Sequence, residues 1–342
     1  MNRSAQFSDP SIEDKVAALR GPQAYMAPPG RVEVKETHMS WVFLGEEFVY
    51  KLKKPVRYDF LDFSTLELRR RDCECEVELN RRLANGVYLG VVALRRQADG
   101  SLMLAPAGQV VDWLVKMRRL PAARMLDAAI LDNTVKGADL IGVCRLLADF
   151  YRHRAASVAM APDAYVQRFA ADIEANLDVL GQAEYGLPMT QLKRLADWQR
   201  GFIRERAVLL MRRAQQARLV EGHGDLRPEH ICLIAEPVVI DCLEFNRDLR
   251  ILDPLDELAY LALECERLGA PALGARVLNY YIDVSGDRSE ADLMRFYTVY
   301  RACLRATLAI WHTDDDTVDD HDKWRTRARD YLELALHHID AS

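Results

Sequence analysis

The chain has 342 residues, half of them hydrophobic, and a formal net charge of −6 at pH 7. That length predicts about two domains. The acidic balance argues against a nucleic-acid-binding protein, which usually presents a strongly basic face. No apolar run is long enough to cross a membrane, so we expect no membrane partner.

Seven cysteines are present, an odd number, and none form a Cys-x-x-Cys pair. We therefore expect reduced thiols rather than a disulfide framework or a zinc ribbon. The N-terminal segment MNRSAQFSDPSIEDK lacks the apolar stretch of a secretory leader. Together these features predict a cytoplasmic protein.

The N-terminal third predicts a β-rich region that contains one long helix. That helix is predicted within residues 61–86, where Ser64 and Glu67 form a capping-box pattern and Gly86 marks the end. Asp99-Gly100 predicts a hairpin turn. A shorter helix is predicted near residues 11–20, and strands are predicted at 32–36, 40–44, 48–54, 87–96, 101–106 and 110–121.

From about Leu120 the apolar spacing becomes helical, with one β interruption at residues 231–241. The sequence therefore predicts an α+β fold with two lobes, a β-rich N-terminal lobe at 1–118 and a helical C-terminal lobe at 119–342. A cleft between lobes is a default ligand site. The predicted helices are 138–152, 163–180, 190–216, 256–268, 271–284, 290–311 and 323–339.

Two carboxylates carry the strongest functional signal. Asp225 lies in the segment HGDLRPEHIC, and Asp241 follows the apolar strand of VVIDCLE. Phosphoryl transfer needs one carboxylate to orient the attacking hydroxyl and another to hold the metal on the nucleotide phosphates. We assign Asp225 to the first role, as catalytic base, and Asp241 to the second.

A strand lysine held by a helix glutamate can neutralise nucleotide phosphates. Lys51 is the preferred lysine, with Lys53 as its rival on the same strand face. Glu76 is the preferred helix partner, with Glu74 and Glu78 as rivals. No glycine-rich phosphate loop is present, so Thr37 and Ser40, in the turn between the first two strands, are the candidate phosphate-binding hydroxyls. The alternative for that turn is an ordinary hairpin loop.

The rest of the catalytic segment is less decisive. His223 is expected to hydrogen-bond the loop backbone, and Arg227 either reaches an anion or pairs with Glu229. His230 stands where kinases have a metal-binding Asn, although imidazole suits Mn²⁺ or Zn²⁺ better than Mg²⁺.

For Glu244 and Asn246, a metal or substrate contact and a helix-capping role both remain as alternatives. Asp253 and Asp256 are expected to cap the next helix and brace the loop. The acidic run 312–322 is open between a docking face, a metal site and a solvated loop.

These motifs resemble the aminoglycoside phosphotransferase (choline kinase-like) branch of the protein-kinase-like fold. ETHMSWVFL, FVYKLKKPV, FLDFSTLELR, ELNRRL, YLGVV, VKMRRLP and IDCLEFN look like uncharacterised bacterial members, some of which are fused to a C-terminal P-loop kinase. The resemblance covers roughly residues 30–310. It implies a bilobal fold, ATP-dependent phosphorylation of a small hydroxylated molecule, a nucleotide lysine at Lys51, a base at Asp225 and a metal aspartate at Asp241.

The leading hypothesis is therefore a small-molecule kinase that uses ATP with Mg²⁺, or with Mn²⁺, and holds adenine near residues 112–119. The alternative is a kinase-like nucleotide-binding or regulatory module with little or no catalysis, for which His230 is the best support. A kinase acting on protein side chains ranks last, because no activation-segment motif follows Asp241.

Overall fold

The computed structural model describes residues 9–58, 61–314 and 320–341. They form two compact units. The β-rich unit comprises Met1–Ala122 and Val238–Arg247, so the segment that carries Asp241 belongs to it. The helical unit comprises Ala123–Pro237 and Asp248–Ser342. Each unit has its own hydrophobic core.

The β-rich unit is built on one antiparallel sheet of six strands in the order β1-β2-β3-β8-β6-β7. The predicted hairpin at Asp99 is confirmed, because Asp99 accepts from the Ser101 amide between β6 and β7. The strands of this unit are β1 (Glu33–Glu36), β2 (Ser40–Leu44), β3 (Phe48–Lys53), β4 (Arg57–Tyr58), β5 (Leu61–Asp62), β6 (Tyr88–Arg96), β7 (Leu102–Met103), β8 (Gln109–Arg118) and β11 (Val238–Val239).

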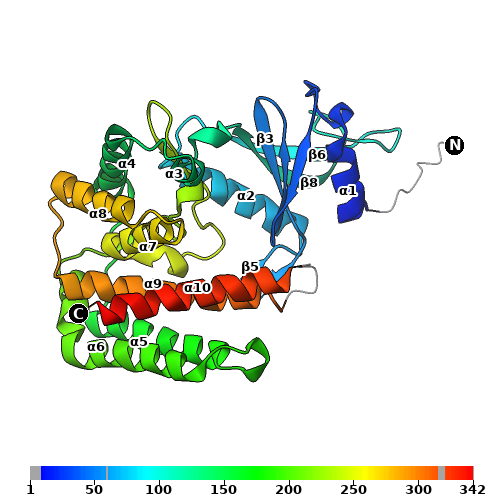
Figure 1. The fold of residues 1–342 in the computed structure, drawn as a ribbon. Helices are drawn as coiled ribbons and strands as arrows, with labels where there is room; N and C mark the ends of the chain where they lie inside the picture. The colour runs from blue at the N-terminus through cyan, green and yellow to red at the C-terminus, as the bar shows by residue number, and fades with distance from the viewer. Residues whose placement is uncertain (1–8, 59–60, 315–319, 342) are drawn as a thin grey trace. The chain divides into compact units, whose positions relative to one another are not determined.

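Two helices pack on the sheet. Figure 1 shows α2 (Leu66–Arg81) lying across it, and α1 (Ile12–Arg20) lies near β2 and β7. Side chains alternate along a strand. Leu52 of β3 therefore packs into the core with Val16 and Leu19 of α1, whereas Lys51 and Lys53 face α2. This alternation brings both lysines to the acidic side of α2.

The expected ends of α2 were wrong by a few residues. The cap is Thr65 rather than Ser64, since the Thr65 hydroxyl accepts from the Leu68 amide. Ser64 instead bonds to Asp62 in the preceding turn. The helix ends at Arg81, before Gly86, which has a positive φ of 83° in the following turn. A short polar side chain one residue from the true cap gives nearly the same sequence signal.

The helical unit contains a long antiparallel layer in which α9 and α10 run side by side next to α5 and α6 (Figure 1). The predicted helix at 138–152 stops at Asp149 and continues as a π-helical turn, Phe150–Arg154. The helices are α3 (Leu126–Leu131), α4 (Gly137–Asp149), α5 (Pro162–Leu180), α6 (Met189–Gln215), α7 (Pro254–Arg267), α8 (Pro271–Ser285), α9 (Ala291–Trp311) and α10 (His321–Asp340).

The catalytic segment predicted from sequence occupies irregular structure in the helical unit. It follows strand β9 (Val220–Glu221), which pairs with β12 (Ile251–Leu252). It ends in a 3-10 turn at Pro228–His230 and strand β10 (Ile231–Cys232). The β9–β12 pair therefore leads into the loop, and helix α7 packs against the 3-10 turn at its end.

Six of the seven cysteines are buried and Cys75 is partly buried. No disulfide joins them among the described residues. Among the described residues, no helix is long and apolar enough to cross a membrane. The acidic run 312–322 lies partly outside the described residues, at 315–319.

Candidate functional site

Lys51, Glu76 and Asp241 lie together in the β-rich unit. The Lys51 ammonium is 3.0 Å from a Glu76 carboxylate oxygen and 2.8 Å from Asp241 Oδ1. Burial alone lowers the pKa of Lys51, but the Asp241 and Glu76 carboxylates outweigh it and hold the pKa well above its usual value. The lysine therefore remains charged in this position.

The rival lysine, Lys53, occupies a different and fully buried position. Its ammonium contacts Asp72 at 2.9 Å and the second oxygen of Glu76 at 2.5 Å, and it also pairs with Glu244. Glu76 is completely buried and receives one lysine on each oxygen. Burial lowers the pKa of Lys53, but the three carboxylates together raise it well above its usual value.

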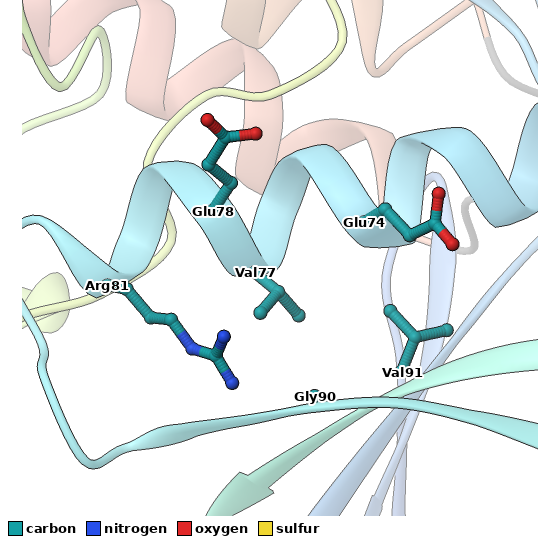
Figure 2. Close-up of a pocket in the computed structure, with 6 residues that line it drawn as sticks. All are labelled: Glu74, Val77, Glu78, Arg81, Gly90 and Val91. Carbon is teal, nitrogen blue, oxygen red and sulfur yellow. The ribbon is translucent and has the colours of Figure 1, made fainter.

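The rival glutamates on α2 face elsewhere. Glu74 and Glu78 are exposed and line a surface hollow of about 520 Å³ between α2 and β6 (Figure 2). Arg81 closes one end of this hollow and donates to the carbonyls of Tyr88 and Leu89. Two residues along a helix turn a side chain to the opposite face, so only Glu76 points toward Lys51.

Asp241 has an unusual backbone. Its φ of 61° is in the left-handed region, which is uncommon for a residue other than glycine and is tolerated by Asp better than by most. The Asp241 amide donates to the Tyr88 hydroxyl at 3.1 Å, and the Cys242 amide donates to the Asn80 side chain at 2.9 Å. These two bonds fix the turn, while the Asp241 side chain remains 44% exposed.

Asp225 is held from two sides in the helical unit. One carboxylate oxygen accepts from Arg227 at 3.0 Å, and the other accepts from the Tyr260 hydroxyl at 3.0 Å. Burial raises the pKa of Asp225, but Arg227, His230 and Arg305 outweigh it and hold the pKa well below its usual range. The group is therefore ionised and its orientation is restrained, although its side chain remains 27% exposed.

The loop backbone is braced by Glu257 of α7. The carboxylate of this buried residue accepts from the amides of His223 and Gly224 and from the Tyr151 hydroxyl. His223 is buried, and its Nδ1 accepts from the Asp225 amide, which confirms the predicted loop contact. The bracing expected of Asp253 and Asp256 is thus supplied by Glu257.

Asp253 and Asp256 hold helix α7 in place rather than the loop itself. Asp253 caps α7 by accepting from the Leu255 amide, as predicted, and it also pairs with Arg213. Asp256 pairs with Arg301 at 2.6 Å. These buried ion pairs fix α7, which carries both Glu257 and Tyr260.

His230 supports the loop through both ring nitrogens. Nδ1 donates to the Asp225 carbonyl at 2.8 Å, which leaves Nε2 to accept from Arg227 at 3.2 Å. The role of metal ligand predicted for His230 therefore requires Arg227 to release Nε2. Arg227 also pairs with Glu229 at 2.7 Å, one of its two predicted alternatives.

Thr37 and Ser40 form the turn between β1 and β2. The Thr37 hydroxyl donates to the Ser40 carbonyl and accepts from the Ser40 amide, both at 3.0 Å, and Ser40 is buried. Their phosphate contact stays a prediction. Asp112, at the start of the predicted adenine segment, is buried in strand β8 between Lys15 and Arg69, so its side chain is structural.

Sequence reasoning missed several residues that hold Asp225 and Asp241 in place, each within its own unit. Tyr260 and Glu257 are three residues apart on α7 and so share a face. That spacing, directly after the Asp-Pro cap, was the available signal. Tyr88 and Asn80 carried none, because their contacts to the Asp241 turn join segments about 150 or more residues apart.

No family model matches the chain. Among curated proteins, an uncharacterised protein of Mycobacterium tuberculosis and its counterpart in Mycobacterium bovis are each 34% identical over 277 residues. The match covers 80% of this chain and 54% of each relative. The chain thus spans about half the length of the curated relatives it matches.

Solved structures give a wider comparison. A choline/ethanolamine kinase family protein from Mesorhizobium loti matches with a TM-score of 0.54 at 16% identity, over 91% of this chain and 89% of that one. An aminoglycoside 2'-phosphotransferase in its GDP complex matches with a TM-score of 0.53 at 15% identity, over 91% and 94%. A choline kinase from Streptococcus pneumoniae matches with a TM-score of 0.51 at 14% identity, over 94% and 98%.

The chain therefore has the protein-kinase-like fold of the aminoglycoside phosphotransferases and choline/ethanolamine kinases. This confirms the α+β fold class predicted from the sequence, with a β-rich part and a larger helical part. At these identities the comparison establishes the fold, and the chemistry has to be argued from this chain's own residues.

Proposed function

We propose that this protein is an ATP-dependent phosphotransferase that phosphorylates a hydroxyl group of a small molecule. One observation carries the proposal. In a chain with the fold of small-molecule kinases, Lys51 contacts both Glu76, at 3.0 Å, and Asp241, at 2.8 Å. A strand lysine between a helix glutamate and a partly exposed aspartate is the arrangement that kinases use at nucleotide phosphates.

On the nucleotide side, Lys51 would bind the phosphates and Glu76 would keep it oriented. The aminoglycoside 2'-phosphotransferase of similar fold was solved with GDP, which supports a nucleotide as the donor. Asp241 offers partly exposed carboxylate oxygens, the ligand type that Mg²⁺ prefers, so the residues present fit this ion. When bound there, Mg²⁺ would neutralise charge on the phosphates.

On the acceptor side, Asp225 would accept a hydrogen bond from the attacking hydroxyl and take its proton as transfer proceeds. A carboxylate with a lowered pKa is a weak base, so its main contribution is orientation. That suits phosphoryl transfer, which proceeds through a loose transition state and depends more on positioning than on basicity. Tyr260 and Arg227 would supply the orientation by fixing both carboxylate oxygens.

The direct test is transfer of label from γ-labelled ATP to a small-metabolite fraction, with Mg²⁺ or Mn²⁺ present. Asp225→Asn is the catalytic control, because it keeps the size of the side chain and removes its charge. We expect label on a small molecule with the unmodified protein and little with the variant. Equal labelling by both proteins would refute the assignment of Asp225.

A second candidate is a kinase-like module that binds nucleotide and transfers nothing. It is favoured by His230, whose two ring nitrogens are engaged with the Asp225 carbonyl and with Arg227. This candidate predicts measurable ADP binding but no transfer with either metal. His230→Asn separates the two, since gain of transfer in this variant alone would identify a silenced kinase.

A further inference from the structure

Lys53 forms an ion-pair cluster that the proposed reaction does not use. Its ammonium is buried, with 1% of the residue exposed, and contacts carboxylates of Asp72, Glu76 and Glu244. These residues come from three places in the β-rich unit: strand β3, helix α2 and the segment after Asp241. One buried cation therefore ties three pieces of chain together.

The position of this cation is strongly determined. A buried charge is costly unless it is paired and hydrogen-bonded, and a pair that loses one partner leaves an uncompensated charge in the interior. Lys53 has three anionic partners, so its ammonium has little freedom to move. The ring of Phe63, 5.4 Å away, covers it further.

The three carboxylates would otherwise suit a metal ion. One oxygen from each of Asp72, Glu76 and Glu244 lies within 4.8 Å of the others, a spacing compatible with a shared cation. The Lys53 ammonium lies among them and contacts all three carboxylates, so it occupies the position that a metal ion would take. A divalent cation at Asp241 therefore has no competing carboxylate site at these three residues.

The cluster is joined to both groups proposed to act on the nucleotide. Glu76 holds Lys53 with one oxygen and Lys51 with the other. Glu244 is three residues beyond Asp241, whose amide donates a hydrogen bond to the Tyr88 hydroxyl. The chain from Asp241 to Glu244 is thus fixed at both ends, by backbone bonds at one and by Lys53 at the other.

We propose that Lys53 is a positioning residue for the nucleotide site, which acts through Glu244 on Asp241 and through Glu76 on Lys51. This inference rests on the proposed function, because it takes Asp241 as the residue that holds the metal ion. Outer-shell partners of a metal ligand typically change metal affinity by about 10–100-fold when they are removed. The same order of effect is expected here.

The test is calorimetric binding of ADP with and without Mg²⁺, which needs no acceptor. Glu244→Gln keeps the size of the side chain and removes the charge that pairs with Lys53. We expect Mg²⁺ to strengthen ADP binding by the unmodified protein. In Glu244→Gln that gain should fall by about tenfold or more, while metal-free ADP affinity stays within about twofold. Glu78→Gln, on the exposed face of α2, is the matched control and should keep the full gain.

A second variant tests Lys53 itself. Lys53→Met leaves three carboxylates together, and circular dichroism and thermal melting establish whether it folds. If it folds, it should lose the Mg²⁺ gain, and adding Glu244→Gln to it should cause little further loss, because both changes break the same contact. If it does not fold, Glu244→Gln alone decides.

Three outcomes would overturn the inference. In the first, Mg²⁺ strengthens ADP binding by folded Glu244→Gln as much as by the unmodified protein, while Asp241→Asn loses this effect. That outcome would refute only the role of Lys53. The second is an equal loss of ADP affinity with and without Mg²⁺, which a merely structural role would give. The third is a full gain in Asp241→Asn, which removes the metal assignment in the proposed function and this inference with it.

Discussion

The Tyr260 hydroxyl donates a 3.0 Å hydrogen bond to Asp225, on the carboxylate oxygen that Arg227 does not occupy. Tyr260 is buried on α7, and its ring is also covered by the guanidinium of Arg305. A buried aromatic ring on a packed helix has few alternative positions, so its hydroxyl is a fixed donor. The orientation of the Asp225 carboxylate is therefore set by the core of the helical unit.

Tyr260→Phe should slow phosphoryl transfer without unfolding the protein. The change removes only the hydroxyl, so the ring keeps its packing and Asp225 keeps Arg227. We expect kcat to fall about tenfold with little change in KM for ATP, since misplacement of a catalytic group by a fraction of an ångström weakens the transition state. The free energy of unfolding should fall by about 1 kcal/mol.

Tyr300→Phe is the matched control for this prediction. The Tyr300 hydroxyl also donates to a carboxylate, that of Asp172, at 2.7 Å. This bond joins α9 to α5 and does not involve the catalytic segment. We expect a similar loss of stability and an unchanged kcat. If both variants lost activity equally, the Tyr260 bond would matter only for stability.

Lys51→Met should abolish most transfer and leave the fold intact. Glu76 would retain Lys53 on its other oxygen, so no buried carboxylate is left without a cation. We expect transfer to fall by about 10²–10³-fold, the usual effect of removing one donor at a developing or transferred charge. Lys193→Met, at an exposed position of α6, should retain activity. Steady-state kinetics and thermal melting of the two variants check this.

The features that sequence alone predicted were local. Strand alternation placed Lys51 and Lys53 on one face, and helical spacing located α5 to α10 within a few residues. Glu76 could be preferred over Glu74 and Glu78, but no pattern could decide between them. That choice depends on how α2 is rotated on the sheet, which only packing determines.

What the sequence could not predict were contacts between distant segments. The different roles of Lys51 and Lys53 follow from the contact of Lys53 with Glu244, which is 191 residues away in the sequence. His230 was interpreted through the residue type usual at its position, whereas its role in the loop follows from Arg227 and the Asp225 carbonyl. A side chain's partners in space, more than its place in a motif, determined these roles.

The charge of Asp225 should make stability depend on pH in a defined direction. Its pKa is held below the unfolded value, so as pH falls the unfolded chain takes up the proton first. Its stabilising contribution is complete above the ordinary carboxyl pKa of about 4 and is lost progressively below it. At neutral pH we expect Asp225→Asn to be about 1.5 kcal/mol less stable than the unmodified protein.

Urea unfolding from pH 7 down to pH 3.5 tests this expectation. The difference between the two proteins should shrink as the pH falls below about 4. It should also be smaller at every pH in the Arg227→Gln background, because the nearest cation is then absent. A difference that stays constant with pH would show that the loss in Asp225→Asn has a cause other than its charge.

Glu257→Gln should disturb the catalytic segment more than a substitution of any exposed residue within that segment. The carboxylate accepts from the amides of His223 and Gly224, and an amide side chain would turn its NH₂ group toward one of these donors. Leaving a buried donor without an acceptor costs about 1–3 kcal/mol. We expect a loss of stability in that range and a fall in kcat, because the loop that carries Asp225 loses its anchor. Glu266→Gln, on the same helix and paired with His338, is the control that should keep activity. Full activity in a folded Glu257→Gln variant would show that the β9–β12 pair alone holds the loop.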